Sequence, residues 1–338
     1  MDKSAIPPAS RGDPWFDDGN IILLIDADPD RDHPPVAFKV HRGVLSRHSE
    51  IFRSMFEFPQ PAAEAEMLDD CQVVRMYDLP IELSSLIKAL YDGVTFLNRN
   101  VEDFFLLAGI LRLSTKYFVA HLRTQAIRHL TQTWSFTLRG HDEMVELALS
   151  SPVINGTTYP YVHPLHVLNL AHEVNVRLVV PAALYFLSIY PLANILQGDH
   201  PKLSVEHPSR PSSHIALQDI KDYTLMYQYR IDVILDFIRK VCAERSADAA
   251  CQGVRNHCSR VFARLAYNIS QSFTARTGPF HNMMQAVQWV DDDGSLCSIC
   301  KRSFRKDVMK HREKLWSELP GVVGMPSWKE MEEIDLPS

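Results

Sequence analysis

The sequence predicts an α+β domain followed by an all-α domain. In residues 16–133, short apolar strand patterns precede and separate helical patterns, whereas residues 140–329 contain helical patterns only. The chain has 338 residues, of which 46% are hydrophobic, and this is enough for about two domain cores. We expect a flexible lead-in over 1–15, a loop near 198–213 and a tail over 330–338.

Three strands are expected in the first domain. Residues 21–25 form a continuous apolar run, and residues 36–40 form an alternating strand that ends at a histidine. The turn-rich segment 26–35 between them predicts a hairpin with a long loop. Residues 73–78 have the pattern of a third short strand. Together these segments predict a small sheet.

Amphipathic helices surround these strands. The first helix has apolar-face positions at helical spacing at Val44, Leu45, His48, Ile51, Phe52, Met55 and Phe56. A second helix begins at Pro80, because proline suits the first turn of a helix. A helical pair then covers 101–111 and 115–130, with a break near Ser114.

The second half reads as helices throughout. Asp142 can cap a helix that runs to Leu149, and 163–174 predicts another. A third helix has an apolar face from Ile231 to Cys242. The face of a fourth contains Val254, Cys258, Val261, Phe262, Leu265 and Ile269. On this pattern Cys258 is a small core residue.

The segment from Val36 to Phe56 reads F-K-V-H-R and then V-L-S-R-H-S-E-I-F-R-S-M-F. With the element order around it, this segment resembles the BTB/POZ domain over residues 16–133. The motif positions are Phe38, His41, Leu45, Ser49, Phe52 and Phe56. The second half is similar to the helical extension of a large fungal family of BTB proteins, including V-P-A-A-L-Y-F-L-S at 180–188.

The resemblance implies a non-enzymatic protein-interaction module, a scaffold or adaptor that homodimerises through its first domain. In other BTB proteins a second surface recruits a cullin-3 ubiquitin ligase scaffold, through an aromatic or apolar residue, any residue and then glutamate. The matching place here is Phe58-Pro59-Gln60, where glutamine replaces the acid. We therefore favour a dimerising scaffold over a cullin-3 substrate adaptor as the function. Phe58 and Gln60 are the candidate partner surface.

Cys297 and Cys300 form a C-x-x-C pair, and two such thiolates can share one tetrahedral zinc ion. A structural zinc site needs two more ligands, and the candidates for a further ligand are Cys251, His257 and His311. Thiols that merely pack are the alternative. A complete site would favour a transcription-associated zinc-knuckle protein as an alternative function.

Other chemistry finds little support in the sequence. Asp291 to Asp293 precede the C-x-x-C pair and would raise a thiol pKa, which disfavours a redox role. Residues 301–314 contain seven basic against two acidic residues, yet the same aspartates would neutralise much of this patch. The fifteen histidines lack triad partners at recognisable spacing, and no glycine-rich phosphate loop occurs. We therefore assign no catalytic residue and no cofactor other than a structural zinc ion.

Charge and cysteine usage indicate the compartment. The formal charge of -6 argues against wholesale nucleic-acid binding. The N-terminus has no apolar core of a secretory signal, and six unevenly spaced cysteines do not resemble a disulfide framework. Residues 178–196 contain no charged side chain, but Pro181 and Pro191 interrupt them, so we expect buried helices and not a membrane span. The sequence therefore favours the cytoplasm, the nucleus or both.

Overall fold

The computed structural model describes residues 9–27, 34–57, 66–253, 257–272 and 278–337. The chain divides into two units. The first comprises Met1–His129 with Glu206–Pro211, and the second comprises Leu130–Val205 with Ser212–Ser338. The first contains a small mixed sheet with helices and the second is largely helical, which confirms the predicted fold class.

A mixed sheet organises the first unit. Its described strands lie in the order β1-β3-β2-β5-β4, with bounds β1 (Ser10–Arg11), β2 (Ile21–Ile25), β3 (Val36–Val40), β4 (Met67–Leu68) and β5 (Cys71–Met76). Leu23 pairs with Phe38 of antiparallel β3 and with Val74 of parallel β5. β2 is therefore the central strand, which explains its uninterrupted apolar sequence, because both of its faces are covered.

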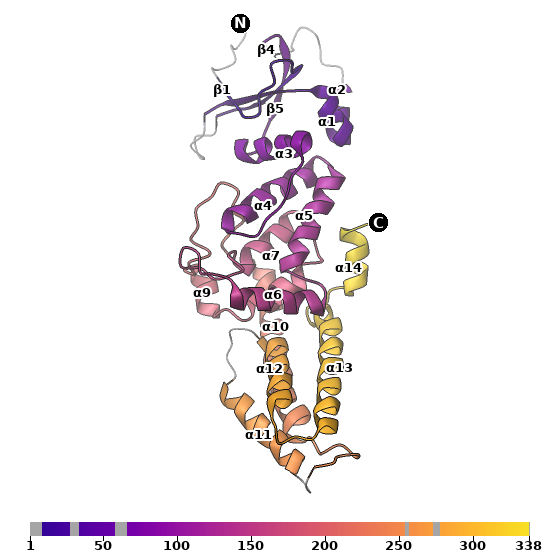
Figure 1. Ribbon diagram of the computed structural model, residues 1–338. Helices are drawn as coiled ribbons and strands as arrows, with labels where there is room; N and C mark the ends of the chain where they lie inside the picture. The colour runs from indigo at the N-terminus through magenta and orange to yellow at the C-terminus, as the bar shows by residue number, and fades with distance from the viewer. Residues whose placement is uncertain (1–8, 28–33, 58–65, 254–256, 273–277, 338) are drawn as a thin grey trace. The chain divides into compact units, whose positions relative to one another are not determined.

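The two faces of the sheet have different neighbours. One face buries Ile22, Leu24, Ala37, Cys71 and Val73 in a cluster of strand residues that also contacts Trp15. Since successive side chains of a strand point to opposite faces, Ile21, Leu23 and Ile25 lie on the other face, toward the helices. Figure 1 shows α1 and α2 beside the sheet and α3 beneath it.

The helices of the first unit are α1 (Arg42–His48), α2 (Glu50–Glu57), α3 (Pro80–Asp92), α4 (Val101–Lys116) and most of α5 (Ala120–Thr133), whose last residues from Leu130 on belong to the second unit. The single helix predicted over 44–56 is in fact two helices. Ser49 separates them with an extended backbone (φ -138°), and its hydroxyl accepts the N–H of Phe52 at 3.0 Å. The break in the next pair lies at Phe118, with φ 51°, and not at Ser114, which remains inside α4.

The second unit contains α6 (Leu138–Ser150), α7 (Pro164–Glu173), α8 (Val180–Leu187), α9 (Leu192–Gln197), α10 (Leu217–Asp236), the π-helix η2 (Phe237–Ala243), α11 (His257–Ser272), α12 (Gly278–Asp292), α13 (Ser298–Val322) and α14 (Trp328–Asp335). One of its core clusters is formed mainly by side chains of α10, η2, α11, α12 and α13. No described helix combines the length and the apolarity that a membrane crossing needs.

Several segments differ from the sequence expectation. The lead-in contains β1, and Lys202 and Leu203 are buried in the irregular segment 198–213. The expected tail begins inside α14, where the buried carboxylate of Asp335 accepts the N–H groups of Arg177 and Leu178, both at 2.7 Å. Such buried hydrogen bonds connect segments far apart in sequence, so no local pattern reveals them.

The cap of α6 is another difference. Thr137, not Asp142, caps this helix, because the Thr137 hydroxyl accepts the N–H of Gly140 at 3.1 Å. The Asp142 carboxylate instead accepts a hydrogen bond from Arg312 at 2.5 Å.

Candidate functional site

His41 stands at the start of α1 and joins three segments of the first unit. Its backbone N–H donates to the Tyr91 hydroxyl at 2.9 Å, and its Nδ1 lies 2.9 Å from the same oxygen. Its Nε2 lies 3.3 Å from the exposed Asp18 carboxylate, and Phe16 stacks on the Tyr91 ring with centroids 4.4 Å apart. These contacts fix the turn between β3 and α1.

Most of the other motif side chains are buried. Phe38, Leu45 and Phe52 belong to the core, whereas Phe56 is half-buried and stacks on Phe52 with centroids 5.8 Å apart. The Ser49 hydroxyl donates to the carbonyl of Tyr117 at 2.5 Å. These motif side chains therefore serve mainly to pack the unit.

The comparisons with known proteins agree with this geometry. Residues 33–130 match the family model described as the BTB/POZ domain. This segment is a BTB/POZ domain. Such domains are typically non-catalytic modules of protein–protein interaction, and they often dimerise. Neither the curated proteins nor the solved structures gave a match to the chain.

Two large aromatic side chains of the BTB domain are exposed. Tyr77 follows β5 and is 83% exposed, and Phe118 lies between α4 and α5 and is 66% exposed. The residues next to them are bonded to each other, since the Asp78 carboxylate accepts hydrogen bonds from Tyr117 and from Lys116. Tyr77 and Phe118 are therefore presented by two neighbouring segments, and we call them the aromatic surface. Phe58 and Gln60, the partner surface expected from the sequence, lie outside the described residues.

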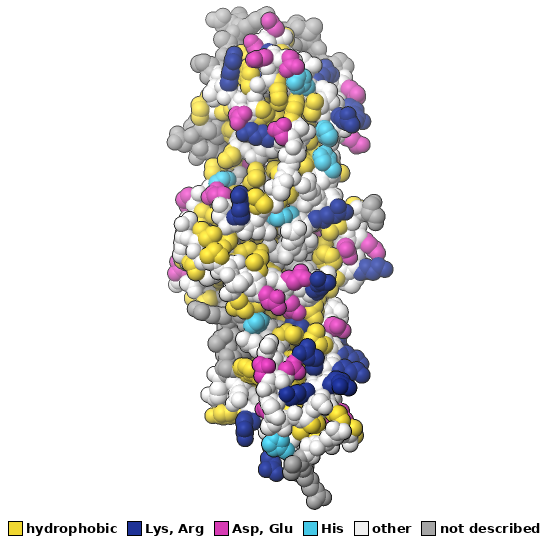
Figure 2. Space-filling model, viewed as in Figure 1, with side chains coloured by type: hydrophobic (Ala, Val, Ile, Leu, Met, Phe, Trp, Pro, Cys, Tyr) yellow, Lys and Arg dark blue, Asp and Glu magenta, His cyan; other side chains and the backbone are white. Residues whose placement is uncertain are grey.

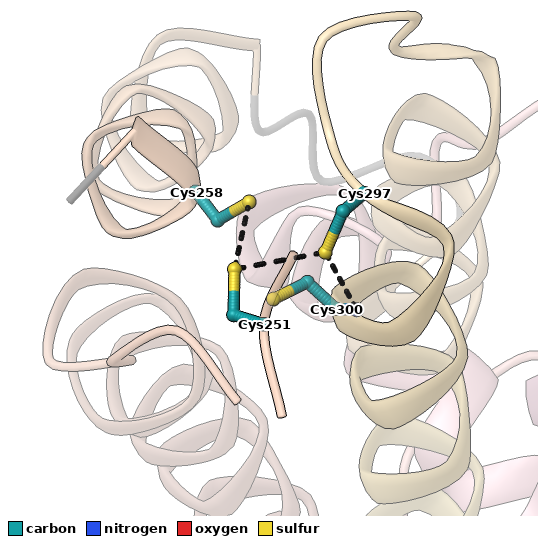
Figure 3. A group of neighbouring side chains, drawn as sticks. All are labelled: Cys251, Cys258, Cys297 and Cys300. Atoms are coloured by element: carbon teal, nitrogen blue, oxygen red, sulfur yellow. Dashed lines mark hydrogen bonds between the residues drawn. The ribbon is translucent and has the colours of Figure 1, made fainter. Parts of the chain in front are cut away.

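Four cysteines converge in the second unit (Figure 3). The sulfur atoms of Cys251, Cys258, Cys297 and Cys300 all lie within 4.8 Å of one another. Cys251 Sγ is 3.6 Å from Cys258 Sγ and 3.6 Å from Cys297 Sγ. Cys258 and Cys300 are buried, whereas Cys251 and Cys297 are half-buried.

The helix ends determine where these thiols lie. Cys297 is the N-cap of α13, and its Sγ accepts the N–H of Cys300 at 3.5 Å. This hydrogen bond lowers the pKa of Cys297 to about 6, while burial raises the pKa of Cys300 to about 12. Cys258 lies in the first turn of α11, and burial raises its pKa. Cys251 belongs to the irregular segment between η2 and α11.

The cluster differs from the ligand set considered from the sequence. Among the three candidates for a further ligand, the structure brings Cys251 to Cys297 and Cys300, whereas His257 and His311 are not in the cluster of possible ligands found among the described residues. Cys258 was set aside as a ligand because its position on an apolar helix face indicated a core residue. Cys258 is both a core residue and a candidate ligand, because it lies in the core cluster and close to the other three thiols. The seven-residue separation of Cys251 and Cys258 is the sequence signal that could have paired them.

The basic segment of α13 is largely engaged within the unit. Arg312 is fully buried, where Nε donates to the carbonyl of Phe280 at 3.1 Å. Arg305 forms an ion pair with Asp291, and Lys301 donates to the Asp291 carbonyl at 2.7 Å. Figure 2 shows dark blue side chains gathered over the α13 region with magenta ones beside them. This charge pattern is typical of a solvated helix more than of a phosphate-binding surface.

Proposed function

We propose that this chain is a non-enzymatic scaffold whose BTB domain joins two copies into a homodimer and whose aromatic surface binds another protein. The BTB/POZ match over residues 33–130 carries the proposal. The buried motif side chains support it, because they build the domain and leave no assembled group of catalytic side chains among them.

Helices α1 and α2 offer the surface for self-association. Val44, Ile51 and Met55 are half-buried in the single chain, so a second copy can cover their remaining apolar area. The described edge strands β1 and β4 have two residues each. Edges this short provide few unpaired backbone groups for sheet extension, which favours a helix-mediated dimer.

The mass of the full chain in solution tests the dimer. Light scattering at tens of micromolar concentration should give twice the chain mass of 38.6 kDa. Ile51→Lys and Met55→Lys should each give the single-chain mass and still melt cooperatively, because a long cationic side chain at a half-buried position can reach water in the monomer but not in the dimer.

Leu97→Lys is the matched control. Leu97 is an exposed apolar residue of the same domain outside α1 and α2, so this variant should remain a dimer. A wild-type chain that stays monomeric at this concentration would refute the proposed self-association.

A further inference from the structure

The distances within the cysteine cluster distinguish between two chemistries. Two sulfurs in a disulfide lie about 2.05 Å apart. Four sulfurs around a tetrahedral zinc ion, each with a Zn–S bond of about 2.3 Å, lie about 3.8 Å from one another. The observed separations of 3.6 Å and the upper limit of 4.8 Å match the second arrangement.

Backbone N–H groups point at the sulfurs as they do in thiolate metal sites. Cys251 Sγ accepts the N–H of Gly253 at 3.3 Å, and Cys300 Sγ accepts the N–H of Asp248 at 3.4 Å. Together with the bond from the Cys300 N–H to Cys297 Sγ, the sulfurs of Cys251, Cys297 and Cys300 each have a backbone donor. Such outer contacts orient metal ligands and stabilise their negative charge.

We propose that Cys251, Cys258, Cys297 and Cys300 bind one structural zinc ion. Four sulfur ligands complete a tetrahedron and leave no open position for water or substrate, which is the property of a structural rather than a catalytic site. Thiolates select zinc over the hard cations Mg²⁺ and Ca²⁺. On binding, each thiol proton goes to solvent and four Zn–S bonds form, without a change of oxidation state.

The ion would join three segments at the edge of one core. Cys251 comes from the segment after η2, Cys258 from the start of α11, and the other two ligands from the start of α13 (Figure 3). Cys258 and Cys300 also belong to the core cluster beneath. Since a metal that binds only the folded state stabilises it, zinc should raise the melting temperature of the second unit.

Metal analysis of the full chain, purified under reducing conditions without a histidine tag, tests the site. We expect about one zinc ion per chain, in keeping with a single tetrahedral Cys₄ site. Cys251→Ser and Cys297→Ser should lose the zinc ion, because each variant lacks one thiolate ligand. Both cysteines are half-buried, so the substitutions should cost little packing. Cys71→Ser is the control: this thiol donates to the Gly19 carbonyl in the other unit, so the variant should retain its zinc. Absence of zinc from folded protein supplied with the metal would overturn the proposal, as would stoichiometric iron or a Cys251–Cys258 disulfide.

A second measurement uses the wild-type chain alone, so it does not require that any variant folds. Wild-type chain stripped of metal and titrated with Co²⁺ should develop thiolate-to-cobalt charge-transfer absorption and the intense visible bands of tetrahedral cobalt, saturating at one equivalent. Zinc should then displace the cobalt and abolish the absorption, as expected from the higher affinity of such ligand sets for zinc. The weak bands of octahedral cobalt would overturn the proposal.

Discussion

A histidine without charge lies in the core of the second unit. His141 is 1% exposed and packs against Trp316 and Phe186, with ring centroids 4.8 Å and 5.4 Å away. Neither ring nitrogen has a hydrogen-bond partner among the described residues. Burial lowers the pKa of His141 to about 3.

This histidine should make the second unit sensitive to acid. In the unfolded chain His141 has its ordinary pKa of about 6.5, so below that pH the unfolded state binds a proton that the folded state does not. The contribution of uncharged His141 to the free energy of unfolding is complete above pH 6.5. Below pH 6.5 this contribution falls by about 1.4 kcal/mol for each unit that the pH decreases, until the folded pKa is reached.

The measurement is urea unfolding at several pH values between 7.5 and 4.5, followed by tryptophan fluorescence. His141→Leu, which removes the titrating group at similar volume, should give a shallower loss of stability toward acid. His172→Gln is a control of opposite sign. The hydrogen bond that His172 Nε2 donates to the Asp219 carboxylate raises the pKa of His172, so its stabilisation is present below about pH 6.5 and is lost as the pH rises through the raised value. Equal acid sensitivity in His141→Leu and wild type would contradict the assignment.

Individual residues also show where sequence reasoning ends. The C-x-x-C spacing identified Cys297 and Cys300 as candidates because the spacing is local. Cys251 and Cys297 are 46 residues apart, and their proximity depends on how the segment before α11 and α11 itself lie against α13, where Phe262 stacks on Phe304. Cys258 shows that one side chain can belong to the apolar face of a helix and to a cluster of candidate ligands. Helical periodicity alone therefore identifies only its packing role.

At the scale of elements, the turn after α4 contains one residue, Phe118, that has both a strained backbone and an exposed ring. Phe118 has φ 51°, and the N–H of Val119 donates to the Ser114 carbonyl at 2.8 Å, as in the helix endings that favour glycine. A bulky side chain in this conformation costs about 1–2 kcal/mol. Because this strained residue exposes its ring, we expect Phe118 to take part in binding.

Phe118→Gly should therefore separate stability from binding. Glycine relieves the strain but gains freedom in the unfolded chain, so the free energy of unfolding should rise by less than about 1 kcal/mol. Capture of partner proteins by the immobilised full chain should fall, because the aromatic surface loses one of its two rings. Phe118→Asn, which also tolerates positive φ, should behave alike, and mass spectrometry of the captured proteins distinguishes a cullin scaffold from other partners.

Two outcomes would contradict the proposed role of Phe118 in binding. Unchanged capture by both variants would exclude the aromatic surface as the binding site. A large fall in melting temperature would show that Phe118 packs more tightly than its exposure indicates.

The strand and helix patterns predicted the elements better than their ends. The run from Ile21 to Ile25 predicted β2 because burial on both faces requires apolar side chains throughout. The break at Ser49 was missed because the serine is polar on an otherwise regular helical pattern. Its hydroxyl is bonded to Tyr117, 68 residues away. Ser49 also caps α2 through the N–H of Phe52, which is a local signal, but its bond to Tyr117 cannot be seen in the local pattern.

For the whole molecule, each unit has buried core residues of its own. The BTB domain buries both faces of its sheet, whereas the second unit has the four cysteines at the edge of one of its core clusters. The two units should then respond differently to the same perturbation. Removal of metal should act on the second unit, and a charge in the BTB core should act on the first.

Phe52→Asp combined with chelation tests this separation. Phe52 is fully buried and stacks on Tyr117 with centroids 4.5 Å apart, so an aspartate there buries an unpaired charge and should unfold the BTB domain. Calorimetry of the wild-type chain should show two transitions, of which Phe52→Asp removes one. A zinc chelator should lower the temperature of the transition that remains. If Phe52→Asp abolishes both transitions, the chain folds as one cooperative unit and the contribution of zinc must be measured on the wild type alone.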